Sequence, residues 1–74
     1  MNQPVAQFSL VLRQLREERG WSQEQLAERA DLNRSYVGEV ERGNAIPSLI
    51  TLSKLATALE IQLSSFIARC EHLT

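Results

Sequence analysis

The feature that most constrains this chain is a link of only three residues between two helical segments. On both sides of Asp31-Leu32-Asn33, apolar side chains recur every three or four positions, which is the period of an amphipathic helix. So short a link holds two helices at a steep angle of about 90–120° to one another. We therefore expect the chain to fold around a crossed pair of helices.

Capping residues mark the limits of these two helices. Ser22, with Gln25 three positions later, forms a capping box at the start of the first. Asn33 is a good N-cap for the second, which is expected to end at the turn of residues 42–44. Asp31 occupies the turn position that most often needs a positive φ, at a cost of about 1 kcal/mol for any residue other than glycine.

Three further helices complete the prediction. The first covers about residues 8–19 and stops at Gly20, a residue type that commonly follows the last helical turn. Ser48 caps a fourth helix, and a short fifth helix is expected over about residues 64–70. No segment alternates apolar and polar residues, so we predict no strand. The predicted fold class is all-α, with five helices.

The length of the chain supports only one hydrophobic core, because a domain of 74 residues buries only about 60% of its unfolded surface. We therefore predict a single domain over residues 1–74, with its core within about residues 8–68. The only cysteine, Cys70, cannot form an internal disulfide, and no apolar run reaches the ~18 residues of a membrane span. These features predict a cytoplasmic protein with no membrane partner.

No group of residues points to catalysis or to a bound cofactor. His72 has no second ligand at metal-binding spacing, and the sequence has no glycine-rich phosphate loop. Ser22 and Ser35 lack the histidine and aspartate partners that would activate a nucleophile. We therefore expect no enzyme activity, no metal, no cofactor and no small-molecule ligand.

The net charge of −1 counts against nucleic acid as a partner, since DNA-binding domains usually carry a basic surplus. Only one face of a domain meets DNA, however, so the objection depends on how the charges are distributed. A DNA-binding role requires that the basic side chains gather on one face and that most acids lie elsewhere.

Four strings along the chain carry a family resemblance: Leu15-Arg16-Glu17-Glu18-Arg19-Gly20, Ser22-Gln23-Glu24-Gln25-Leu26-Ala27, Val40-Glu41-Arg42-Gly43 and Pro47-Ser48-Leu49. Together they resemble the lambda-repressor/Cro-like (XRE) family of helix-turn-helix regulators. The resemblance covers residues 12–66, about three quarters of the chain. It implies a compact five-helix lambda-repressor-like domain that binds double-stranded DNA through its second and third helices.

The resemblance also implies how such a protein works. It implies a sequence-specific transcriptional regulator that binds a palindromic operator as a homodimer. Within the family, the run of residues 34–38 and the compact length are most similar to controller proteins of restriction–modification systems. A small antitoxin or protein-interaction module with the same fold is the alternative.

The resemblance further assigns DNA contacts by position. Gln23, at the start of the second helix, resembles a residue that hydrogen-bonds a phosphate, where helix N–H groups attract an anion. Arg34 is the main candidate base reader, because arginine can donate two parallel hydrogen bonds to guanine O6 and N7. Arg42 and Asn44, in the turn after the third helix, are expected to contact phosphates. The residues expected to face the groove are Asn33, Arg34, Ser35, Tyr36 and Glu39.

Several of these residues keep more than one role open. Ser35 can reach a base or a phosphate, and Tyr36 can press on a thymine methyl or a sugar, or pack on the protein surface. Glu39 has three candidate roles: it accepts from a cytosine amino group, orients Arg34, or excludes wrong sequences by repulsion.

Two conspicuous side chains are given structural roles instead. The family pairs an arginine of the first helix with a glutamate of the third, and Arg16 and Glu41 stand at those positions, so Glu41 is expected to form a structural ion pair rather than to contact DNA. Trp21 lies between Gly20 and the cap Ser22, where a hydrophobic staple is commoner than a base-stacking residue.

Apolar residues remain after the predicted core is filled, mainly in the last third of the chain. A domain this small cannot bury all of them, and an exposed apolar patch usually marks an interface. Twofold dimers are the commonest assemblies and match palindromic operators, whereas a monomer with an apolar flank is the alternative. The predicted dimer contacts are Ile50, Leu63, Phe66 and Ile67.

Overall fold

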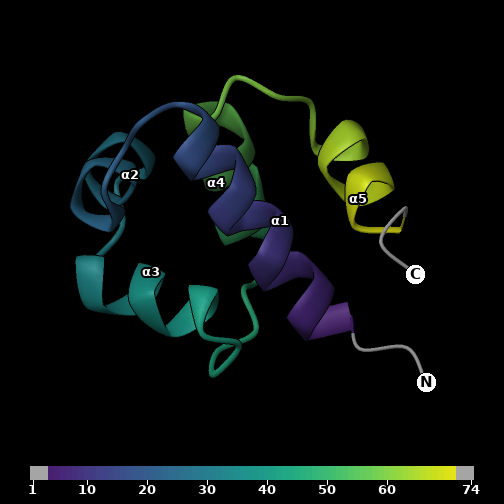
Figure 1. Ribbon diagram of the computed structural model, residues 1–74, viewed down its shortest axis with the longest axis horizontal. Helices are drawn as coiled ribbons and strands as arrows, with labels where there is room; N and C mark the ends of the chain where they lie inside the picture. Colours follow the sequence, from purple (N-terminus) through teal and green to yellow (C-terminus); the bar gives the residue numbers. More distant parts are fainter. Residues whose placement is uncertain (1–3, 72–74) are drawn as a thin grey trace.

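The computed structural model describes residues 4–71, with side chains from residue 7 onward, and this part of the chain contains five helices and no strand. Helix α1 crosses the middle of the molecule, with α2 and α3 to one side and α5 to the other (Figure 1). The all-α prediction is confirmed. The helices are α1 (Pro4–Glu18), α2 (Gln23–Ala30), α3 (Arg34–Glu41), α4 (Leu49–Ala58) and α5 (Leu63–Glu71).

Three predicted N-caps begin α2, α3 and α4. The Ser22 hydroxyl accepts from the backbone N–H of Gln25 at 3.1 Å, and the Gln25 side-chain oxygen accepts from the Ser22 N–H at 2.8 Å. Asn33 Oδ1 accepts from the Ser35 N–H at 2.8 Å, and Ser48 caps α4 in a similar way. Each of these oxygens satisfies an N–H group that has no partner inside its helix.

The link between α2 and α3 contains the predicted left-handed residue. Asp31 has φ 57° and ψ 49°, and the next N–H, that of Leu32, donates to the Ala27 carbonyl at 2.8 Å. Glu60 repeats this geometry after α4, with φ 57°, and the Ile61 N–H donates back into the last turn of α4 at 3.0 Å. Both links close their helix by the same backbone pattern. The second was not predicted, because no sequence signal such as glycine marks that position.

Helix α1 begins at Pro4, four residues before the predicted start. The prediction rested on the apolar stripe, whose first member is Phe8. Proline favours the first helical turn because its φ is preset and its missing N–H would have no partner there. Helix α5 extends one residue beyond the predicted range at each end.

The core lies where α1 meets the other helices. Phe8 and Phe66 stack with their ring centroids 5.1 Å apart, which joins α1 to α5. Phe66 is only 1% exposed, so the prediction that it contacts a partner is wrong: packing against α1 already covers it. None of the described helices is both long and apolar enough to cross a membrane. The buried apolar residues are Val11, Leu12, Leu15, Leu26, Ala27, Ala30, Val37, Val40, Leu55, Ala56, Leu59 and Phe66.

Candidate nucleic-acid interface

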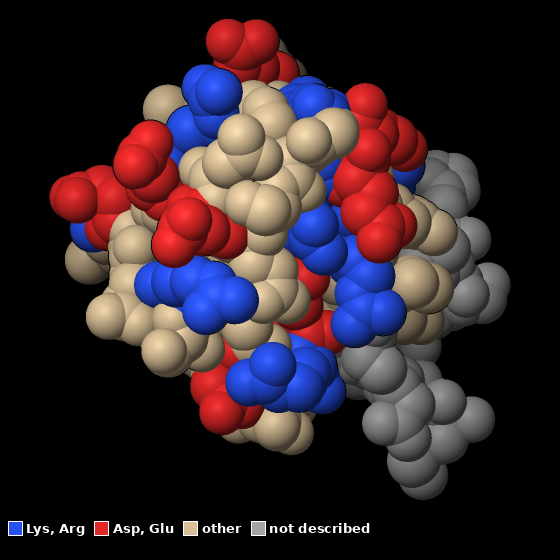
Figure 2. All heavy atoms as spheres, turned by 60° about the vertical axis from the view of Figure 1, so that its left-hand side comes forward, with Lys and Arg blue, Asp and Glu red and all other residues tan. Residues whose placement is uncertain are grey.

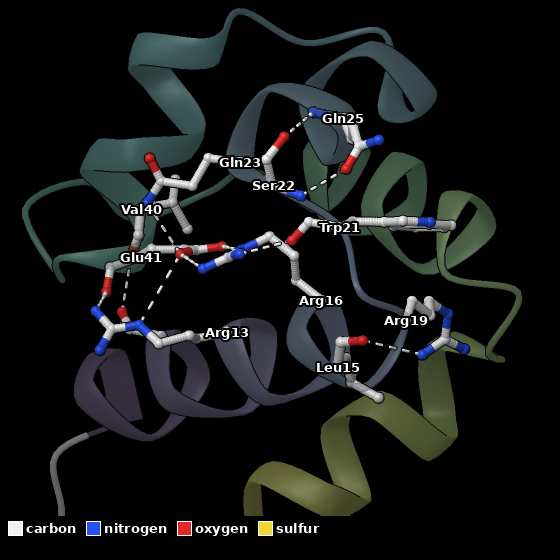
Figure 3. A network of polar contacts seen from close by, with 11 residues as sticks. Arg13, Leu15, Arg16, Arg19, Trp21, Ser22, Gln23, Gln25, Val40 and Glu41 are labelled. Carbon is white, nitrogen blue, oxygen red and sulfur yellow. Dashed lines mark hydrogen bonds and ion pairs between the residues drawn. The ribbon is translucent and has the colours of Figure 1, made fainter.

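A buried ion pair fixes α3 against α1 (Figure 3). Arg16 Nε donates to Glu41 Oε2 at 2.7 Å and Arg16 Nη2 to Glu41 Oε1 at 3.0 Å, and the Glu41 side chain is fully buried. Arg16 Nη1 also donates to the Trp21 carbonyl at 2.8 Å, which ties the α1–α2 link to the same guanidinium. The hydrogen bond to Glu41 raises the pKa of Arg16, so the arginine stays charged. The structural role expected for Glu41 is confirmed.

Gln23 joins this network from the first turn of α2. Its side-chain nitrogen donates to Glu41 Oε1 at 3.0 Å, a contact that was not predicted (Figure 3). A signal for it existed, because a buried carboxylate has more acceptor positions than a single arginine fills. The amide of Gln23 has a second N–H group, and its contact with a DNA phosphate stays a prediction.

Trp21 packs against the hydrophobic core beside the same network and is partly buried. The guanidinium of Arg29 lies 4.3 Å from the centroid of the indole ring, over its face. Cations are attracted to the faces of aromatic rings, and here the cation occupies a surface on which a base would have to stack. These contacts favour a structural role for Trp21.

Helix α3 buries one side and exposes another. Val37 and Val40 are 0% and 1% exposed, whereas Arg34 and Ser35 are exposed to solvent. Tyr36 is partly buried and packs against the core, so packing accounts for part of its surface. All five residues predicted to face the groove reach the surface, and they are Asn33, Arg34, Ser35, Tyr36 and Glu39.

The carboxylate of Glu39 binds two residues of the turn that follows α3. Its Oε1 lies 3.3 Å from Arg42 Nη2, and its Oε2 accepts from Asn44 Nδ2 at 3.0 Å. The backbone supports this arrangement, since the Asn44 N–H donates to the Glu39 carbonyl at 2.9 Å. The hydrogen bond from Asn44, followed by the charge of Arg42, holds the pKa of Glu39 below its ordinary value. Glu39 therefore binds Arg42 and Asn44, two of the residues that were predicted to contact DNA phosphates.

Gly38 leaves room for Arg42 above the backbone of α3. A Cβ at this position would lie 3.3 Å from Arg42 Nη1 and 3.4 Å from Gln23 Oε1. The guanidinium therefore lies across the helix beside the Gln23 amide. Three predicted phosphate contacts, Gln23, Arg42 and Asn44, form one cluster around Gly38 and Glu39.

Figure 2 shows the face of the molecule that carries α2 and α3. Lys and Arg side chains are spread from the top to the lower part of this face, whereas most Asp and Glu side chains lie towards its upper half. Glu41 adds no exposed charge, because it is buried and paired with Arg16. The net charge of −1 is therefore compatible with a basic surface near α3.

An apolar groove of about 230 Å³ lies where the α3–α4 link approaches α1 and α5. Ile46, at its edge, is 77% exposed, and the side chains of Leu49 and Ile50, in the first turn of α4, are 68% and 72% exposed. Of the other predicted dimer contacts, Ile67 is exposed and Leu63 is partly buried. The groove is lined by Phe8, Ile46, Pro47, Leu52, Phe66, Ile67 and Cys70.

Cys70 is partly buried in this groove, and burial raises the pKa of its thiol. The thiol is therefore protonated at neutral pH, and Cys70 contributes to the groove as a small apolar side chain. Within residues 4–71, no three side chains of the kinds that bind metals come together. His72 lies outside the described residues.

Known proteins resemble this chain in sequence and in structure. The sequence profile of the helix-turn-helix family matches residues 12–66. The chain is 42% identical over 71 residues to the HTH-type transcriptional regulator SutR of Escherichia coli (strain K12), and the match covers 95% of this chain and 40% of SutR. It is 36% identical over 72 residues to the control protein C.MunI of a Mycoplasma species, covering 96% of this chain and 97% of C.MunI.

A solved structure adds to this likeness. The crystal structure of the restriction-modification controller protein C.AhdI from Aeromonas hydrophila superposes with a TM-score of 0.81 and 48% sequence identity. That match covers 84% of this chain and 94% of the C.AhdI chain. The chain therefore spans about two fifths of SutR but nearly the full length of the two control proteins.

Proposed function

Because this chain belongs to the helix-turn-helix family, we propose that it is a sequence-specific DNA-binding transcriptional regulator. The observation that carries the proposal is the crossed pair α2 and α3. Arg16 and Glu41 lock α3 to α1, while Arg34 and Ser35 stay exposed on α3. A rigidly held helix with polar outer residues suits the major groove, which is wide enough to admit one α-helix.

Within this function, the contacts divide by kind. Arg34 is proposed to read a base, because its exposed guanidinium can donate to guanine O6 and N7. Gln23, Arg42 and Asn44 are proposed to bind phosphates, since they gather in one cluster beside the first turn of α2. Phosphate contacts set the register of a protein on DNA, and base contacts then supply specificity.

We further propose that the protein acts as a homodimer on a palindromic operator. Monomers rarely expose a contiguous apolar patch, and twofold pairing covers both copies of such a patch at once. The exposed side chains of Ile46 and Leu49 extend the interface that was predicted around Ile50, Leu63 and Ile67.

Control of a restriction–modification system is the role that we propose for this regulator. The named controllers C.MunI and C.AhdI align with this chain over 97% and 94% of their own lengths. Alignment over nearly the full length favours a controller over the alternative of an antitoxin. A transcriptional regulator works beside the DNA, which supports the cytoplasmic location expected from the sequence.

Selection of bound sequences from a randomised duplex pool tests the proposal. We expect enriched sequences with twofold symmetry, in which the half-site centres lie about 34 Å apart or a multiple of that distance. The Arg34→Ala variant should lose the preference at one position of each half-site. A folded protein that enriches no common sequence would contradict sequence-specific binding.

A further inference from the structure

Glu39 brings a negative charge to the surface that we propose to face DNA. Its side chain is 47% exposed, and its carboxylate lies 3.3 Å from the Arg42 guanidinium and accepts from Asn44 at 3.0 Å. The buried network of Arg16 and Glu41 does not include this carboxylate. An acid in this place repels phosphates, so its effect has to be sought in DNA binding.

While Glu39 holds Arg42, the charge of the guanidinium is already compensated. A cationic side chain strengthens DNA binding by displacing counterions from a phosphate, and each such contact adds about 0.9 to the slope of log affinity against log salt. Arg42 contributes fully only after it exchanges the carboxylate for a phosphate. Since the pair is exposed, this exchange changes affinity by only about two- to fivefold.

The major groove offers groups that can take the carboxylate from Arg42. The amino groups at cytosine N4 and adenine N6 are donors in this groove, and a carboxylate can accept from them. Where such a group lies opposite Glu39, the base satisfies the carboxylate and Arg42 becomes free to bind a phosphate. Where it is missing, the carboxylate stays on Arg42 and repels the DNA backbone.

We propose that Glu39 is a specificity-determining residue that withholds Arg42 from DNA lacking a base amino group opposite it. The inference rests on the proposed DNA-binding function and adds a link between base reading and phosphate binding. Gly38 leaves space for the Arg42 guanidinium beside Glu39, since a Cβ at position 38 would lie 3.3 Å from Arg42 Nη1. Specificity then arises partly from weakened binding to wrong sequences.

Glu39→Gln is the variant that tests the proposal, because glutamine keeps an oxygen that can accept from Asn44 but carries no charge. We expect its affinity for random-sequence duplex to rise about two- to fivefold per half-site, with a salt slope steeper by up to about 0.9. Affinity for the selected operator should rise less, so the ratio of operator binding to random-sequence binding falls. Fluorescence anisotropy titrations at several NaCl concentrations measure both quantities.

Two controls accompany this variant. Glu60→Gln removes one exposed carboxylate from the link between α4 and α5, and should leave the binding ratio and the salt slope unchanged. Thermal unfolding of Glu39→Gln should match that of the wild type, because the Glu39 side chain is exposed.

Arg42→Ala separates the proposed mechanism from a general loss of repulsion. In the Arg42→Ala background, Glu39→Gln should no longer steepen the salt slope, because the cation that it would free is gone. The proposal is overturned if Glu39→Gln weakens random-sequence binding, or strengthens it equally with and without Arg42. It is also overturned if Glu39→Gln behaves like Glu60→Gln while the wild type binds DNA. A wild-type chain that binds no duplex would overturn the proposed function as well.

Discussion

Glu39 and Glu41 lie two positions apart on α3, yet water reaches only one of them. Glu41 is buried, and it accepts from two nitrogens of Arg16 and one of Gln23. Glu39 is 47% exposed and lies beside Arg42. A carboxylate removed from water is tolerated only when its partners replace that water, so the two acids should respond differently to loss of charge.

Replacement of the buried acid should damage the fold. Glu41→Gln is expected to lower the free energy of unfolding by about 3 kcal/mol, because the Arg16 side chain, 13% exposed, loses its counter-charge. Glu39→Gln is the matched control and should leave that free energy nearly unchanged. Urea unfolding measures both. The structural assignment fails if Glu41→Gln keeps its stability while its base preference changes.

Asp31 should test the cost of a left-handed residue. At φ 57°, a side chain is strained by about 1 kcal/mol, and its exposed pair with Lys54 at 4.0 Å offsets little of this cost. Asp31→Gly should therefore be neutral or slightly stabilising, whereas Asp31→Ala should be less stable than Asp31→Gly by about 1 kcal/mol. Chemical denaturation of both variants decides the matter. A glycine variant less stable than the alanine variant would show that the strain is not the main effect.

Alanine variants on α2, on α3 and in the turn after α3 should distinguish residues that contact bases from residues that contact phosphates. Arg34→Ala is expected to cost about 1–3 kcal/mol per half-site and to relax the preference at one position. At the operator, Arg42→Ala should flatten the salt slope by about one unit. Gln23→Ala should leave that slope nearly unchanged, because a neutral amide displaces no counterion. Equal weakening of matched and mismatched duplexes by Arg34→Ala would identify a phosphate contact instead.

Helix α5 is joined to α1 by Arg69 and Glu18, whose charged atoms lie 2.6 Å apart. The hydrogen bond from Arg69 holds the pKa of Glu18 below its ordinary value of 4.5. A carboxyl with a lowered pKa in the folded state stabilises the fold above pH 4.5, and this contribution is lost as the pH falls through the folded-state pKa.

The stability of the wild type should therefore fall more steeply below pH 4.5 than that of Glu18→Gln. Arg69→Ala should reduce the steepness in the same way, since it removes the cause of the lowered pKa. Melting temperatures measured from pH 3 to 7 provide the comparison. Parallel curves for the wild type and both variants would rule out this role for the Glu18–Arg69 pair.

Two apolar side chains of nearly equal exposure distinguish the proposed dimer face from the rest of the surface. Ile67 is 45% exposed and lines the apolar groove, whereas Leu10 is 46% exposed on α1 and does not line it. Phe66 is unsuited to this comparison, because a charge at a residue that is 1% exposed would disrupt the core.

Ile67→Asp should yield a monomer under conditions in which Leu10→Asp and the wild type are dimers, as measured by sedimentation velocity. Operator binding by Ile67→Asp should weaken steeply, since unlinked half-sites lose the gain from effective concentration. Ile50→Asp should behave in the same way. A wild-type monomer at micromolar concentration that binds one half-site tightly would contradict the proposed dimer.

Spacing along the chain was enough to predict the helix limits that depend on near neighbours. Ser22, Asn33 and Ser48 each cap a helix through an N–H group two or three residues away. Asp31 turns the chain within a link of three residues. Contacts of this kind depend only on local order, so residue type and position reveal them. The pair of Arg16 and Glu41, 25 residues apart, was expected only because of the family resemblance.

Packing in three dimensions settles which side chains remain available at the surface. Phe66 and Ile67 are neighbours on α5 and were expected to act alike, yet one is 1% exposed and the other 45%. In the same way, Gln23 binds Glu41, a partner 18 residues away that the sequence analysis did not predict. An apolar stripe shows which side of a helix is buried, but the depth of burial depends on which helix covers it. The choice of ionic partner depends on how side chains from separate segments meet.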